Sequence, residues 1–119
     1  MNPRELALAA LRCDDLSVRQ QMKNAARESF SWSHAPAPDF RPKEVRSRAF
    51  YAAVVELLCS RRGEAPPAWT KSVTGSPSPV FLVKSAKTSP AMRRESVAST
   101  PEPLKKRNMF AVRDYLDLA

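Results

Sequence analysis

The prolines of this chain decide where it can be helical. Proline cannot donate a backbone hydrogen bond and clashes with the preceding turn, so it interrupts a helix anywhere except at its start. Of the 11 prolines, one is Pro3 and the others gather in the ranges 36–42, 66–79 and 90–103. Long helices are therefore expected before residue 66, and an irregular course after it.

Two helices are predicted before the first proline cluster. The first runs from Pro3 to about Cys13, with Asn2 as its cap and proline at the position that suits it. The second is predicted to begin at Ser17, with Gln20 at capping-box spacing, and to end near residue 31 or 32. Apolar residues recur at helical spacing in both.

The strongest helical pattern lies between Pro42 and Gly63. Pro42 is placed to open this helix, which is predicted to run to Arg62 with Gly63 as its C-terminal cap. Apolar side chains cover one broad face: Val45, Ala49, Phe50, Ala53, Val54, Leu57 and Leu58. We expect this helix to be the central element of the core.

The second half is expected to hold short elements only. Trp69 should anchor the segment after Gly63 by packing back on the helices. The range 80–83 fits one short strand or an extended segment. A helix should start at Ser89 and Pro90, a single turn could occupy 102–107, and helical spacing returns in 112–118.

Together these patterns predict an all-α or mainly α protein. We expect one domain over 1–119, with four to five short helices and at most one short strand. Its helical core should lie in 1–63, and 64–119 should be a Pro-rich, basic, partly extended segment that ends in a short helix.

The residues that most enzymes need are scarce. The chain has one histidine, His34, and two cysteines, Cys13 and Cys59, which are expected to be reduced thiols in apolar helical stripes. Asp14 and Asp15 fall in a predicted turn, and two glycines cannot form a Gly-rich phosphate loop. We therefore expect no enzymatic activity, cofactor, bound metal or small-molecule substrate.

The apolar segments are also short. The run from Leu6 to Leu11 is bounded by charged residues, unlike a secretory signal, and no segment approaches the roughly 20 apolar residues that span a bilayer. A soluble, cytoplasmic protein without membrane contact is expected.

Basic residues outnumber acidic ones. Lys and Arg number 20 against 12 Asp and Glu, which gives a net charge of +8. The densest basic stretch holds Lys84, Lys87, Arg93, Arg94, Lys105, Lys106 and Arg107. Such a stretch fits a surface for phosphates, a surface for an acidic protein, or a merely solvated face.

The first two predicted helices, 3–13 and 17–31, allow a helix-turn-helix interpretation. The second would present side chains of the types that contact phosphates and base edges: Arg19, Gln20, Lys23 and Arg27. A small DNA-binding transcriptional regulator is therefore one hypothesis, although a helical hairpin is also the default packing of two short helices.

The C-terminal half resembles a family of small bacterial proteins. The resemblance rests on Pro67, Ala68, Trp69 and Thr70, on Pro79, Val80 and Phe81, and on the run from Thr100 through Arg107, Asn108 and Met109 to Phe110. Proteins of this family carry a Pro-Ala-Trp segment after a helix and a basic Arg-Asn-x-Phe motif near the end, and are often encoded beside nucleotidyltransferase-like proteins.

The resemblance implies an antitoxin-like role, in which the protein binds and neutralises a partner toxin, a nucleotidyltransferase-like enzyme encoded next to it. A basic surface would complement the acidic metal-binding carboxylates of such an enzyme. The partner-binding residues expected on this basis are Lys105, Lys106, Arg107, Asn108, Phe110 and Trp69.

Overall fold

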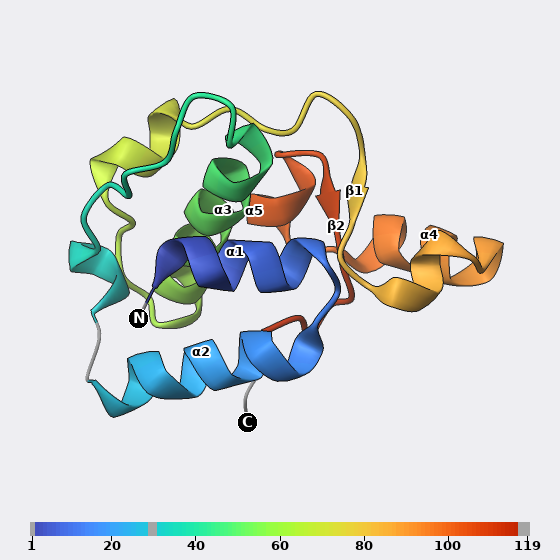
Figure 1. Cartoon of the computed structure of the whole chain (residues 1–119), viewed down its shortest axis with the longest axis horizontal. Helices are drawn as coiled ribbons and strands as arrows, with labels where there is room; N and C mark the ends of the chain where they lie inside the picture. Colours follow the sequence, from blue (N-terminus) through green and yellow to red (C-terminus); the bar gives the residue numbers. More distant parts are fainter. Residues whose placement is uncertain (1, 29–30, 117–119) are drawn as a thin grey trace.

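The structure, a computed structural model, describes residues 2–28 and 31–116 and confirms a mainly α protein (Figure 1). Within these residues the α-helices are α1 (Pro3–Leu11), α2 (Asp15–Arg27), α3 (Val45–Arg61), α4 (Pro90–Ser99) and α5 (Glu102–Lys105). Three short 3₁₀ helices are η1 (Trp32–His34), η2 (Ala68–Ser72) and η3 (Lys84–Lys87). None of the described helices is long and apolar enough to cross a membrane.

Helix α3 is the centre of the core, as predicted. Every residue from Ala49 to Leu57 is buried, because α1, α5, η1 and η2 all pack against this helix. The predicted start at Pro42 is wrong, since the helix begins at Val45. Arg41 donates its backbone N–H to the Glu44 carboxylate at 2.9 Å, and this contact closes a turn that contains Pro42 ahead of the helix.

Helices α1 and α2 pack on each other as an antiparallel hairpin (Figure 1). Asn2 caps α1 as predicted, accepting hydrogen bonds from the N–H groups of Arg4 and Glu5. Helix α1 ends at Leu11, before Cys13, whose φ of 58° lies in the left-handed region and turns the chain.

The predicted bounds of the second helix are wrong at both ends. Asp14, not Ser17, is the cap, because the Asp14 carboxylate accepts hydrogen bonds from both the N–H and the hydroxyl of Ser17 at 3.2 and 2.7 Å. Helix α2 ends at Arg27, and η1 is a separate turn after it. Residues 29 and 30, which the prediction included in this helix, lie outside the described residues.

The second half contains a strand pair that the sequence did not predict. β1 (Val80–Phe81) was expected as at most a lone strand, but it pairs in parallel with β2 (Met109–Phe110). Residues 113–116 form turns instead of the predicted C-terminal helix, and residues 117 and 118 of that prediction lie outside the described part. The predicted start of α4 is correct, since Ser89 caps it by accepting from the N–H of Met92 at 3.3 Å.

Residues 84–99, comprising η3 and α4, form an arm that extends from the helical body (Figure 1, right). The two helices of this arm pack on each other, with Ala86 and Ser96 fully buried. The arm contacts β1 through η3 and through Arg93 of α4, whose guanidinium lies 5.3 Å from the centre of the Phe81 ring. The arm is thus a small helical unit attached at one end.

Candidate partner-binding site

The structure buries one residue of the predicted partner-binding set. Arg107 is 3% exposed, and its guanidinium donates to the carboxylate of Glu56, to the carbonyl of Pro103 at 3.0 Å and to the carbonyl of Thr70 at 2.9 Å. Arg107 is therefore part of the core and does not belong to an exposed basic patch.

Lys106 approaches the same carboxylate from outside, with its Nζ 2.9 Å from Glu56 Oε1. Burial alone would raise the pKa of the Glu56 carboxyl, but the hydrogen bonds from Arg107 and Lys106 outweigh it and hold this pKa below its ordinary value. The Glu56 side chain is thus a buried carboxylate shared by two cations.

Three further residues of the predicted set make contacts inside the protein. Trp69 stacks on Tyr51 with ring centroids 6.1 Å apart and donates its indole N–H to the carbonyl of Ala35 at 2.8 Å. This contact confirms the predicted anchor. Phe110 lies against Phe81 at 5.5 Å between centroids. Asn108 has a left-handed φ of 62° and donates its side-chain amide to the Ser76 carbonyl at 3.3 Å.

Of the six predicted partner-binding residues, Lys105 and Lys106 are exposed, Trp69, Asn108 and Phe110 are half-buried, and Arg107 is buried. The six therefore do not form one accessible surface.

The four residues of the DNA-binding hypothesis, in contrast, do share one accessible surface. Arg19, Gln20, Lys23 and Arg27 are all exposed on α2. Within residues 2–28 and 31–116, no carboxylate pairs with Arg19, Lys23 or Arg27. This face is cationic, and its Gln20 donates a side-chain hydrogen bond to Asn24 Oδ1 at 3.0 Å.

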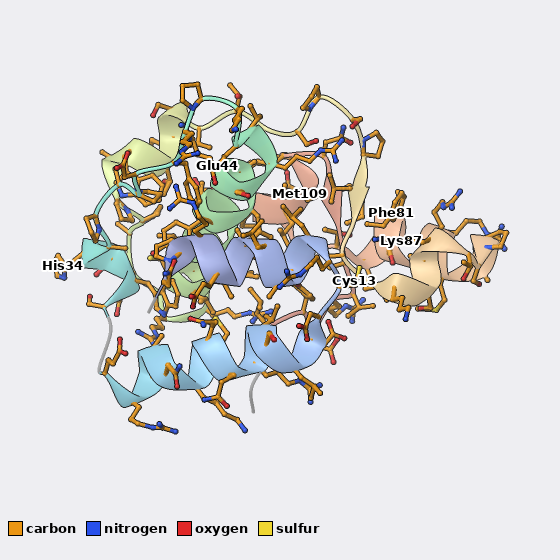
Figure 2. The ribbon with its side chains drawn as sticks, viewed as in Figure 1. Cys13, His34, Glu44, Phe81, Lys87 and Met109 are labelled. Carbon is orange, nitrogen blue, oxygen red and sulfur yellow. The ribbon has the colours of Figure 1, made fainter. Side chains whose placement is uncertain are left out.

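The groups suited to nucleophilic chemistry lie apart. His34 is exposed, and Figure 2 shows it on the side of the molecule opposite to Cys13. Cys59 is buried, which raises the pKa of its thiol. Cys13 is not in a helical stripe as predicted but in the α1–α2 turn, where its thiol lies 3.7 Å from the carbonyl oxygen of Phe81. Across the described ranges, no group of three or more His, Cys, Asp or Glu side chains could hold a metal ion.

Two open hollows lie between α1, the start of α3 and β1, and Arg46 lines both of them. We refer to the two hollows together as the α1–β1 groove. The lining residues are Leu8, Leu11, Lys43, Glu44, Val45, Arg46, Ser47, Pro77, Pro79, Val80, Phe81 and Lys87. Leu8 and Val45, 43% and 37% exposed, are two of the few large apolar side chains that the described surface presents to water.

The rim of the α1–β1 groove is positively charged. Lys43, Arg46 and Lys87 are exposed, and Arg46 is held in place by donating to the Ser78 hydroxyl at 2.9 Å. The Glu44 carboxylate is balanced by Arg4, which donates two hydrogen bonds to it at 3.0 Å each. These bonds, with the one from the Arg41 N–H, lower the pKa of the Glu44 carboxyl to about 2.

Sequence reasoning missed this groove because its residues come from four separate segments. The one local signal is Leu8, a large apolar residue that lies off the buried stripe of α1, between buried neighbours at Ala7 and Ala9. A single exposed leucine is ordinary on a protein surface, so this signal alone would not have identified the groove.

Comparison of the chain with known proteins found no relative. The antitoxin-like family named from the C-terminal motifs therefore remains a hypothesis based on those motifs. No protein-family model, no curated protein and no solved structure matches the chain.

Proposed function

We propose that this chain is an antitoxin-like binding protein that docks onto an acidic partner protein through the α1–β1 groove. The observation that carries the proposal is the combination of exposed Leu8 and Val45 with a cationic rim that forms no ion pair among the described residues. Protein interfaces combine an apolar centre with a polar rim, and opposite charge on the partner steers association and fixes its orientation.

The family resemblance supplies the identity of the partner in this proposal. It implies a nucleotidyltransferase-like toxin encoded next to this chain, whose active site carries acidic metal-binding carboxylates. A cationic groove placed over those carboxylates would block the site and compete with the metal ions for them. The chain itself needs no catalytic residue for this role.

The first test is co-expression of the protein with the product of the adjacent gene, followed by size-exclusion chromatography with mass determination. We expect a stable complex of defined stoichiometry, and we expect this chain to restore growth when the neighbouring protein alone is toxic. If no complex forms and the neighbour is harmless, the antitoxin proposal is wrong.

The groove is tested with Leu8→Asp and Val45→Asp. Both side chains are exposed, so the fold should tolerate the change, whereas a carboxylate in the apolar centre of an interface should weaken the complex at least tenfold. Leu16→Asp is the matched control, because Leu16 is 79% exposed on α2 and lies outside the groove. Equal losses from the groove and control variants would place the docking surface elsewhere.

DNA binding by α2 is the second candidate function, favoured by Arg19, Lys23 and Arg27, which are exposed and form no ion pair within the described part of the chain. If α2 contacts DNA, replacing these three residues by Glu should abolish binding to DNA from upstream of the chain's own gene. The same variant should still bind the partner protein, which separates the two roles.

A further inference from the structure

The basic residues of the stretch 84–107 differ in whether their side chains have partners inside the protein. Arg107 and Lys106 both form ion pairs with the Glu56 carboxylate, so neither cation is available for a ligand. Arg93 is also engaged, since its guanidinium lies 5.3 Å above the Phe81 ring and donates to the carbonyls of Ala86 and Lys87 at 3.2 and 3.1 Å. Arg93 therefore fastens the arm to β1.

Three other cations of the arm form no ion pair with the described part of the chain. Lys84, Lys87 and Arg94 are exposed, and no carboxylate in residues 2–28 or 31–116 pairs with them. Glu95 is the single acidic residue of the arm. Because η3 and α4 pack on each other, these cations are carried on helical turns with a fixed relation to one another.

The side chains between these cations suit phosphate better than protein. Exposed Ser85 and Thr88 lie beside the lysines. Nucleic-acid phosphates are contacted by Lys and Arg side chains and by Ser and Thr hydroxyls. Protein interfaces are instead depleted in Lys and Ser and need an apolar centre. Val97, 40% exposed, is the one large apolar side chain that the arm exposes.

From these contacts we propose that the arm binds the phosphate backbone of a nucleic acid through Lys84, Lys87 and Arg94. This activity is separate from the proposed docking of a protein in the α1–β1 groove, although Lys87 lies at the junction of the two surfaces. Backbone contacts carry no sequence information, so the arm binds duplexes of any sequence.

The test measures binding of a short labelled DNA duplex of arbitrary sequence by fluorescence anisotropy at several salt concentrations. For the unmodified protein, log K should fall linearly with log salt concentration. Lys84→Glu combined with Arg94→Glu should weaken binding about tenfold or more and reduce the slope by about 2, because each phosphate contact contributes about 0.9 to it. Lys87 is left unchanged because it also lines the groove.

The matched control is Lys71→Glu combined with Arg113→Glu, which changes the net charge by the same amount at two exposed residues outside the arm, α2 and the α1–β1 groove. We expect this control to keep the slope of the unmodified protein. Arg19→Glu combined with Lys23→Glu on α2 tests the competing DNA surface, and thermal unfolding followed by circular dichroism should show all three double variants folded. A second arm variant, Lys84→Gln with Arg94→Gln, should give an intermediate loss.

Three results would overturn the proposal. The first is no binding of DNA by the unmodified protein at low salt. The second is loss of binding in the α2 variant but not in the arm variant, which would assign the DNA to α2. The third is binding of an acidic polypeptide such as polyglutamate, but not of DNA, through Lys84 and Arg94, which would make the arm a protein-binding surface. Complex formation with the partner protein is measured separately with the Leu8 and Val45 variants, so neither proposal depends on the other.

Discussion

Arg107 and Glu56 are 51 positions apart in the chain, and their side chains meet in the interior as a buried ion pair. The same guanidinium donates to the carbonyl of Thr70 in η2. A single side chain thereby joins the central helix α3, the segment after it and the chain just before β2. The irregular second half is held to the helical core at this point.

Removal of Arg107 should be strongly destabilising. In Arg107→Ala the Glu56 carboxylate loses its buried partner, and breaking one side of such a pair costs about 3–5 kcal/mol of unfolding free energy. Urea denaturation measures the change. The matched control is Lys106→Ala, which removes the exposed partner of the same carboxylate and should cost about 1 kcal/mol or less. Equal losses for the two variants would contradict this assignment.

Gly75 lies where the chain passes over the backbone of Arg107. A Cβ at residue 75 would lie 2.5 Å from the Arg107 Cα, and the neighbouring N–H of Ser76 donates to the Arg107 carbonyl at 2.9 Å. Gly75→Ala must therefore push two backbones apart, and we expect a loss of about 3 kcal/mol in unfolding free energy.

The matched glycine variant is Gly63→Ala. Gly63 has a φ of 68°, but no atom lies within 4 Å of its added Cβ, so only backbone strain of about 1 kcal/mol is expected. Urea denaturation of the two variants checks that Gly75→Ala loses more unfolding free energy than Gly63→Ala. A larger loss in Gly63→Ala would contradict the close approach at Gly75.

Acid should weaken the turn that precedes α3. The hydrogen bonds from Arg4 lower the pKa of the Glu44 carboxyl to about 2 from an ordinary value of 4.5. A carboxyl whose pKa is lower in the folded chain contributes stability that is fully present above pH 4.5 and is lost as the pH falls towards 2.

Unfolding free energy measured across this pH range should therefore depend less on pH in Glu44→Gln. Part of the dependence should remain in that variant, because hydrogen bonds from Ser17 also lower the pKa of the Asp14 carboxyl. An unchanged pH profile would show that Glu44 is not bound to Arg4 in solution.

Both tyrosines of the chain should resist ionisation while it is folded. Burial raises the pKa of Tyr51 to about 12 and also raises the pKa of Tyr115. A rise in pKa above the ordinary value of 10 means that stability falls as the pH increases from 10 towards 12. Ultraviolet absorbance should show no tyrosinate near pH 10 in the folded protein, whereas the urea-unfolded chain should titrate there. A native tyrosinate signal near pH 10 would mean that at least one ring is accessible.

Local signals in the sequence determined where several elements begin. The Asn2 cap, the Ser89–Pro90 start and the dominance of α3 were all predictable, because capping and apolar periodicity act between residues within a few positions of each other. The start of α2 was predicted at Ser17, but the Asp14 carboxylate caps this helix by accepting from the N–H and the hydroxyl of Ser17.

Contacts between distant residues could not be predicted in this way. The strands β1 and β2 have two residues each, too few for a period, and each is stabilised by its pairing with the other. The basic composition suggested that Arg107 was exposed, but Glu56 and Thr70 make its burial possible. The α1–β1 groove and the free cations of the arm likewise arise where separate segments pack. The sequence by itself thus determined the caps of α1 and α4 and the dominance of α3, because these depend on neighbouring residues. The tertiary structure decided which charges are buried and which remain available for binding.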